Sequence, residues 1–159
     1  MVPPCGTAKA TLVDLMRLDG RVALVTGAGA GLGRAIASYL AQQGARVALL
    51  DRHQAAAQSL ADEIVGQGGN AKAHACDIAY ETQVQKAVSE VVTQWAGIDV
   101  VVNSAGVTSA PGMPFTNNSE ADWDRVLAIN LKGTFFVCKA ACSVGRNSRG
   151  TGPVTSLVL

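Results

Sequence analysis

The chain has 159 residues, a length that suits one domain, and 48 % of them are hydrophobic while 16 % are charged. The formal net charge is +1, without a basic cluster or an acidic tail, so we expect neither nucleic acid nor an anionic membrane as a partner. No apolar run approaches the roughly 18 to 20 residues that a membrane-spanning helix needs. The N-terminus also lacks the order of a signal peptide, which favours a cytoplasmic location.

The predicted elements begin after an N-terminal extension. Residues 1–15 show no usable period, and we expect them to be disordered and to lie outside the fold, with Met16 as an alternative start. Residues 16–142 then read as one dinucleotide-binding domain, and 143–159 as a divergent tail. The tail begins as a polar Gly/Ser/Arg stretch and ends in a β-prone piece, 154–159, which is a possible fifth strand.

Apolar runs alternate with helical patterns along the domain. The runs 21–26, 46–51, 71–77 and 98–106 are predicted to be buried parallel strands. Between them lie three amphipathic helices. The first carries the stripe Leu32, Ile36 and Leu40; the second carries Leu60, Ile64 and Val65; the third carries Val84, Val88, Val91, Val92 and Trp95.

A polar loop over 108–119 and a long helix over about 120–142 complete the domain. This alternation predicts the α/β class, with the N-terminal part of a doubly wound parallel sheet of the Rossmann type and four or five strands.

The segment TGAGAGLG, 26–33, lies between the first strand and its helix. Glycines there permit a tight turn and bring the backbone close to a pyrophosphate, which the helix N-terminus attracts. The alternative is a merely tight turn, but Asp51 ends the next strand, 18 residues after Gly33, where a carboxylate can bind a ribose diol. Asp51 and the neutral Ala30 favour NAD, whereas Arg52 keeps NADP as the less favoured alternative.

The spacing Gly27-x3-Gly31-x-Gly33 resembles the TGxxxGxG motif of the short-chain dehydrogenases/reductases. Further matches to this family are Asp77, near the adenine; NSAG, 103–106, which is similar to NNAG; and Asn130 in NLKG, which corresponds to the Asn of the catalytic set. The resemblance covers about 17–142 and is to the bacterial branch of 3-oxoacyl reductases and secondary-alcohol dehydrogenases. It implies hydride transfer between a nicotinamide cofactor and a secondary alcohol or ketone.

The candidate catalytic residue is therefore Asn130. The candidate cofactor-binding residues are Thr26, Gly27, Gly31, Leu32, Gly33, Asp51, Arg52, Asp77, Ile78, Asn103, Ala105 and Gly106. For Asp77 a helix N-cap is the alternative, and for 103–106 a structural turn. Asn130 interrupts an apolar helix and is costly to bury unpaired, so we expect it to have a partner, either through a water chain or at a local kink.

No metal site is predicted. The four cysteines are Cys5, Cys76, Cys138 and Cys142, which form no CxxC pair and are read as reduced thiols packed as small hydrophobes. His53 and His74 are isolated and are read as surface or packing residues.

The family's Ser and YxxxK catalytic segment has no match here, since neither Tyr39 nor Tyr80 is followed by Lys at the required spacing. We therefore expect a chain truncated before this segment, by a natural end, a frameshift or an incomplete gene model, that is inactive alone. The alternative is a non-catalytic nucleotide-binding or interaction module. The long helix is apolar on more than one face, so we also expect self-association.

Overall fold

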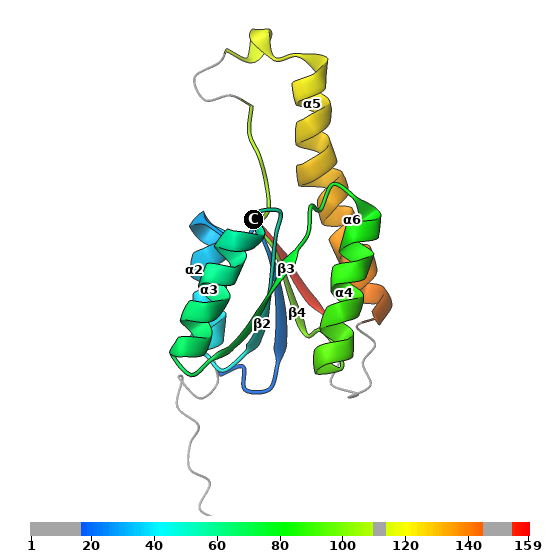
Figure 1. The fold of residues 1–159 in the computed structure, drawn as a ribbon. Coiled ribbons are helices and arrows are strands. Elements are labelled where there is room, and N and C mark those ends of the chain that lie inside the picture. Colours follow the sequence, from blue (N-terminus) through cyan, green and yellow to red (C-terminus); the bar gives the residue numbers. More distant parts are fainter. Residues whose placement is uncertain (1–16, 110–113, 145–153) are drawn as a thin grey trace, which may run out of the picture.

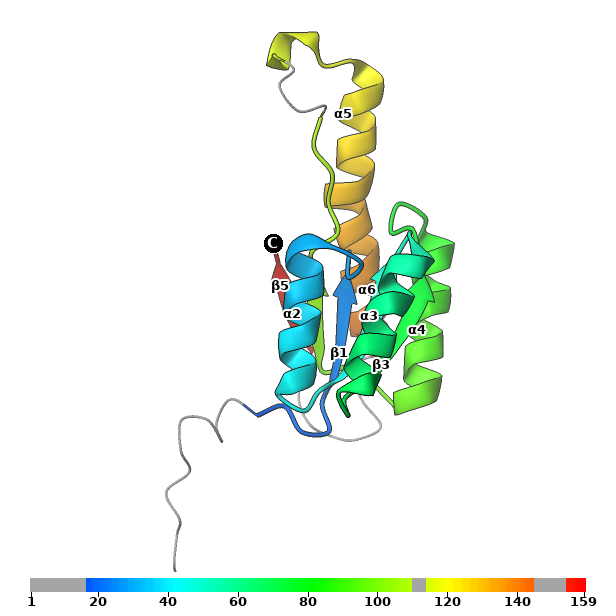
Figure 2. The same ribbon diagram turned by 60° about the vertical axis from the view of Figure 1, so that its left-hand side comes forward.

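The computed structural model describes residues 17–109, 114–144 and 154–159. The expectations for residues 1–15, and those for parts of the loop 108–119 and of the tail 143–159, lie outside these ranges. The described residues form one parallel sheet with helices on both faces (Figures 1 and 2). The predicted fold class, a doubly wound Rossmann-type sheet, is confirmed.

The sheet has five strands in the order β3-β2-β1-β4-β5, with every neighbouring pair parallel. The strands are β1 Val22–Thr26, β2 Arg46–Asp51, β3 Asn70–Ala75, β4 Val100–Asn103 and β5 Thr155–Val158. β1 is central, and Val22 pairs with Arg46 of β2 while Ala23 pairs with Val100 of β4. The possible fifth strand is therefore present, at the edge beside β4.

Two helices cover each face of the sheet (Figure 2). The helices are α2 Gly31–Gln42 and α3 Gln54–Gly66 on one face, and α4 Glu81–Trp95 and α6 Thr134–Val144 on the other. A short 3-10 turn, Phe115–Asn117, and helix α5, Glu120–Leu127, lie beyond the carboxyl ends of the strands, where α5 projects away from the sheet (Figure 1).

The strands are apolar throughout because both of their faces are buried. Alternate residues of β1 point to opposite sides: Val22 and Leu24 pack against α4 and α6, and Ala23 and Val25 against α2 and α3. All four are fully buried. This two-sided core fixes the carboxyl ends of β1, β2 and β4 side by side.

Two residues of the predicted helix stripes are exposed. Leu32 is 69 % exposed, because it lies on the first turn of α2, at the edge of the sheet, where no strand is underneath it. Val65 is 55 % exposed, because the buried face of α3 runs through Leu60 and Ile64, and the next residue along a helix points about 100° away. The two stripe predictions were wrong at these positions.

The predicted helix over 120–142 is present but is not regular. α5 continues through a π-helical turn, Ala128–Gly133, into α6, which ends at Val144. Within this 25-residue helix an 18-residue window has a mean hydropathy of 1.3, so by length and composition it could cross a membrane, contrary to the sequence expectation. Length and composition alone are weak evidence for a membrane-spanning helix, because a core helix passes the same test. Here α6 packs Phe136 and Val137 into the core of the sheet. Only 22 % of the window is buried, however.

Candidate functional site

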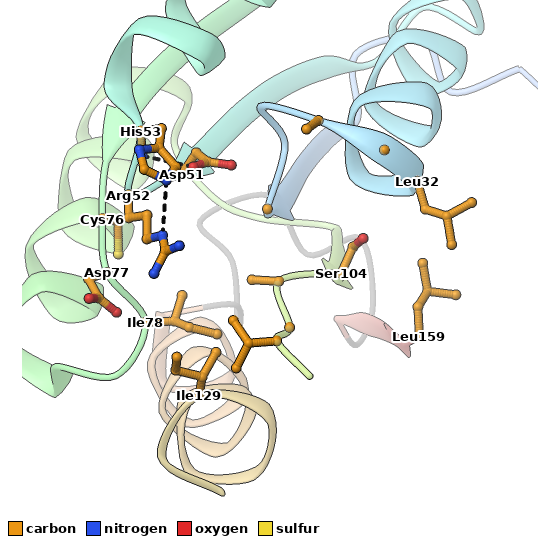
Figure 3. A pocket seen from close by; sticks show the side chains of 16 residues that line it. Leu32, Asp51, Arg52, His53, Cys76, Asp77, Ile78, Ser104, Ile129 and Leu159 are labelled. Carbon is orange, nitrogen blue, oxygen red and sulfur yellow. Dashed lines mark hydrogen bonds between the residues drawn. The ribbon is translucent and has the colours of Figure 1, made fainter. Parts of the chain in front are cut away.

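A cavity of about 470 Å³ lies at the carboxyl ends of β1, β2 and β4 (Figure 3). Open α/β sheets bind ligands at this edge, and the volume lies within the range of small-molecule sites. Nine of the predicted cofactor-binding residues line it: Gly27, Gly31, Leu32, Asp51, Arg52, Asp77, Ile78, Ala105 and Gly106. The other three, Thr26, Gly33 and Asn103, lie behind its wall.

The glycine loop is shaped by two close backbone approaches. Gly27 has φ +66°, and a Cβ there would lie 2.8 Å from the Cα of Ala105. A Cβ on Gly33 would lie 2.2 Å from the carbonyl oxygen of Gly27. A side chain at Gly27 would push the loop away from the segment after β4, and one at Gly33 would distort the loop itself.

Thr26 is buried and joins two walls of the cavity. Its Oγ1 accepts hydrogen bonds from the backbone N–H groups of Ser104 and Ala105, both at 3.1 Å. The hydroxyl also lies 3.5 Å from the carbonyl oxygen of Val102. The structure thus places Thr26 in a supporting position, where it ties the end of β1 to the NSAG segment.

The Asp51 carboxylate lies at one end of the cavity and holds the loop above it. Its Oδ2 accepts a hydrogen bond from the N–H of Gly29 at 2.9 Å, and its Oδ1 accepts one from the N–H of His53 at 2.8 Å. The Arg52 Nε donates to Nε2 of His53 at 3.1 Å. In Figure 3 the Arg52 guanidinium points away from the Asp51 carboxylate, toward Asp77 and Ile78.

Asp77 lies across from Asp51 in the loop after β3. Its Oδ1 accepts a hydrogen bond from the N–H of Ala79 at 3.0 Å, while the N-cap of α4 is Tyr80, without a side-chain cap. The helix N-cap considered for Asp77 is therefore not formed. Beside it, burial and the Asp77 carboxylate raise the pKa of the Cys76 thiol to about 11, so this thiol stays protonated at neutral pH.

Asn103 is 2 % exposed and points into the protein. Its Nδ2 lies 3.5 Å from the Cys138 Sγ and 3.3 Å from the Ser156 Oγ, so its side chain joins β4 to α6 and β5. Only the end of the NSAG segment, Ser104 to Gly106, reaches the cavity. Asn103 therefore has a structural role, and the cofactor-binding role predicted for Ala105 and Gly106 stays a prediction.

Asn130 lies in the π-helical turn and is exposed. Its partner is the backbone of Val107: Oδ1 accepts the N–H at 2.9 Å and Nδ2 donates to the carbonyl at 2.9 Å. The irregular turn thus corresponds to the expected local kink. Val107 lines the cavity and Asn130 does not, so Asn130 acts on the wall and not on the cavity itself.

Some lining residues were not predicted. They are Ala30, His53, Cys76, Ser104, Val107, Ile129 and Leu159. His53 follows Asp51 closely enough to have been suspected, whereas Val107, Ile129 and Leu159 are apolar residues without any motif. His74 is a packing residue, as predicted, with its Nδ1 3.0 Å from the Glu90 Oε2.

Elsewhere in the described ranges Cys142 is exposed, which corrects its reading as a packed thiol. The same ranges contain no group of three or more metal-ligating side chains.

Comparisons with known proteins identify the family. A family model described as short chain dehydrogenase matches residues 21–152. The chain therefore belongs to the short-chain dehydrogenase/reductase family, whose members are oxidoreductases that use nicotinamide cofactors, and the resemblance read from its motifs is confirmed.

Three relatives illustrate the similarity. A D-threitol dehydrogenase of Mycolicibacterium smegmatis is 48 % identical over 124 residues, which is 78 % of this chain and 47 % of the relative. A 3-oxoacyl-[acyl-carrier-protein] reductase of Thermotoga maritima is 38 % identical over 77 % of this chain and 49 % of its own. The crystal structure of a short-chain type dehydrogenase/reductase from Mycobacterium marinum has a TM-score of 0.79 at 34 % identity, covering 84 % of this chain and 53 % of that one. The chain thus spans about half the length of the curated relatives it matches.

The supporting position of Thr26 can be tested by substitution. Thr26→Val keeps the shape of the side chain but leaves the N–H groups of Ser104 and Ala105 without their acceptor. We expect the free energy of unfolding, measured by urea titration, to fall by roughly 2 kcal/mol, because each of the two unpaired donors is only partly buried and costs about 1 kcal/mol, the low end of the usual range. Thr26→Ser keeps the acceptor and should cost much less. Equal stability of the two variants would contradict this assignment.

Proposed function

We propose that the cavity binds a nicotinamide dinucleotide, with NAD preferred over NADP, as part of an oxidoreductase that interconverts a secondary alcohol and a ketone. The observation that carries the proposal is the position of Asp51. Its carboxylate lies at the cavity wall and is held there by the backbone of the glycine loop, through the N–H of Gly29. One ligand could therefore meet the loop and the carboxylate together.

The start of α2 fits a phosphate group. The N-cap residue Ala30 provides no side-chain cap, and no acidic residue lies in the first turn, so the first N–H groups of a 12-residue helix are left for a ligand. At Gly31, which lines the cavity, a Cβ would meet no atom within 4 Å. The backbone is therefore open on the side from which a pyrophosphate would approach.

The preference for NAD follows from the charges at the end of the cavity where Asp51 and Arg52 lie. Asp51 can accept hydrogen bonds from a ribose diol, whereas a 2′-phosphate at the same place would bring two negative groups together. Arg52 could offset this repulsion only beside Asp51, and its guanidinium points toward Asp77 instead (Figure 3). These features support NAD, although Arg52 belongs to the same wall.

The opposite end of the cavity is apolar and suits a nicotinamide ring. Leu32 and Leu159 lie there, on the side away from Asp51 and Asp77 (Figure 3), and would exclude water from the face of a planar ring. A bound nicotinamide supplies the chemistry of accepting or donating a hydride. The residues of this chain would bind and orient it, with Asn130 fixing Val107 in the wall.

We propose that this chain alone has no side chain that acts as general acid or base for proton transfer. Neither Tyr39 nor Tyr80 lines the cavity described above. The Cys76 thiol, with its pKa raised to about 11, does not ionise near neutral pH, and Asn130 is a neutral amide. The chain would then bind cofactor without turning over an alcohol.

The substrate class is proposed from the relatives. Two of them are named for polyols: the D-threitol dehydrogenase above and a sorbitol dehydrogenase of Cereibacter sphaeroides, which is 40 % identical over 79 % of this chain. Polyols carry secondary alcohol groups, so they belong beside 3-hydroxyacyl compounds in a test of the whole protein.

A second candidate function, as an interaction module, is favoured by one surface. We call it the apolar stripe: four side chains spaced by four residues along α5 to α6, with exposed fractions of 55 % for Trp123, 37 % for Leu127, 67 % for Leu131 and 57 % for Phe135. Exposed apolar side chains at this spacing favour association. We propose that the chain self-associates through it.

Cofactor preference is tested at Asp51. Calorimetric titration of the chain should show NAD binding more tightly than NADP. Asp51→Asn removes the charge and keeps one acceptor oxygen. The ratio of the dissociation constants for NADP and NAD should therefore fall about tenfold, which corresponds to about 1.4 kcal/mol. Asp62→Asn, an exposed acid of α3, is the matched control and should change nothing. Equal affinity of the unmodified chain for both cofactors would refute the ribose argument.

Turnover is tested by NADH absorbance with a panel of secondary alcohols and ketones that includes threitol and sorbitol. We expect none from this chain even where NAD binds, since general acid–base catalysis contributes roughly 10²- to 10⁴-fold and no described group supplies it. Turnover that follows the purified chain and is lost in Asn130→Ala would show that the proposal is wrong.

Self-association is tested by sedimentation velocity over a range of concentrations. The chain should sediment as a dimer or larger species, and the double variant Leu131→Ser, Phe135→Ser should shift it to the monomer. Tyr39→Ser, which removes an aromatic side chain that is 49 % exposed on α2, is the control and should leave the association unchanged. A monomeric unmodified chain at all concentrations would contradict the proposal.

A further inference from the structure

Helix α5 carries an arginine that contacts the cavity wall from outside. The Arg125 Nη2 donates a hydrogen bond to the carbonyl oxygen of Thr108 at 3.2 Å. Thr108 directly follows Val107, which lines the cavity and is held by Asn130 through two hydrogen bonds of 2.9 Å. Two side chains of one continuous helix thus hold two consecutive residues of the segment after β4.

The position of Arg125 is itself set by a short polar chain at the start of α5. The Asp122 Oδ1 lies 3.6 Å from the Arg125 Nη2. On its other side, Ser119 donates from Oγ to the Asp122 Oδ2 at 2.7 Å and accepts the Asp122 N–H at 3.1 Å as the N-cap of the helix. The pKa of the Asp122 carboxyl lies below its usual value because of the Ser119 hydrogen bond and the nearby Arg125 charge. The carboxylate is therefore charged over the whole neutral range.

Apolar burial does not hold this part of the molecule together. α5 has no buried residue, and it projects beyond the sheet (Figure 1). Among the described contacts, the polar ones of Arg125 and Asn130 join the helix to the wall at Val107 and Thr108. The loss of one of them should loosen the wall locally, while the core of the sheet stays as it is.

We propose that Arg125 is a positioning residue: through Thr108 it holds the wall formed by Gly106 and Val107, and thereby raises the affinity of the apolar end of the cavity for the nicotinamide half of a dinucleotide. This rests on the proposed function, in which the cavity binds such a ligand. Arg125 itself does not line the cavity, so it acts through the backbone.

Removal of Arg125 should affect ligand affinity differently at the two ends of the cavity. Asp51, Arg52 and Asp77 belong to the ends of β2 and β3, and their hydrogen bonds do not involve α5. A ligand that fills only this end, such as AMP, should not sense Arg125. A ligand that reaches Val107, such as NAD, should lose affinity when Arg125 is removed.

The experiment compares NAD and AMP by calorimetric titration of the same proteins. Arg125→Ala should weaken NAD binding about three- to tenfold, the effect of one hydrogen bond, and leave AMP binding within about twofold. Arg125→Lys keeps a charged donor and should restore most of the NAD affinity. Lys86→Ala, which removes an exposed cation of α4, controls for net charge and should have no effect.

Several outcomes would overturn the proposal. Unchanged NAD affinity in Arg125→Ala would exclude the role, and equal loss for NAD and AMP would indicate general damage. If Arg125→Ala unfolds, as judged by circular dichroism, Asp122→Asn should give a smaller loss for NAD alone, and no loss there would overturn the proposal too. An unmodified chain that binds neither nucleotide would show that the proposed function itself fails, which is seen before any variant is made.

Discussion

The close approach of the β1–α2 turn to the segment after β4 is the contact on which the rest of the site depends. There is no room for a side chain at Gly27 or Gly33. The Thr26 hydroxyl accepts the backbone N–H groups of Ser104 and Ala105, which lie just beyond the end of β4. Both segments leave adjacent parallel strands in register, Thr26 beside Asn103. Once they meet, the start of α2 is fixed over the edge of the sheet, and the cavity can only form beside it.

The cavity that results has two ends of different character, and each is controlled from a different part of the chain. At the charged end, Asp51 and Asp77 come from loops that follow strands of the rigid core. At the apolar end, the wall after β4 depends on polar contacts from a helix that is largely outside the core. The charged end is therefore part of the cooperative core, whereas the apolar end can be loosened by itself.

The fold could be predicted from the sequence because its signals are local and repeated. Apolar runs that end in glycine or aspartate gave the strands, and the glycine spacing placed the loop on the first of them. The site was harder to predict, because a motif does not tell contact from support. Thr26, Gly33 and Asn103 belong to the motifs as fully as Gly31 does, yet they do not line the cavity and instead support its wall.

The remaining differences have simple physical causes. Leu32 fits a helical stripe, but a stripe does not reveal that the strand beneath stops before the helix begins. For Asn130 a partner was expected, but the helical pattern did not show that a π-helical turn brings its side chain to the backbone of Val107. Val107, Ile129 and Leu159 had no signal at all, since an apolar residue in a cavity wall looks like one in a core.

The Asp51 carboxylate has a consequence for the evolution of this site. Both of its oxygens already accept backbone N–H groups, from Gly29 and from His53, so the group that would select a ribose also fixes the shape of the loop around the phosphates. A lineage could not exchange this residue for a neutral or basic one without loosening the loop at the same time. A change of cofactor would then require a second substitution that supplies the lost acceptors, and the two would have to arise together or in a fixed order.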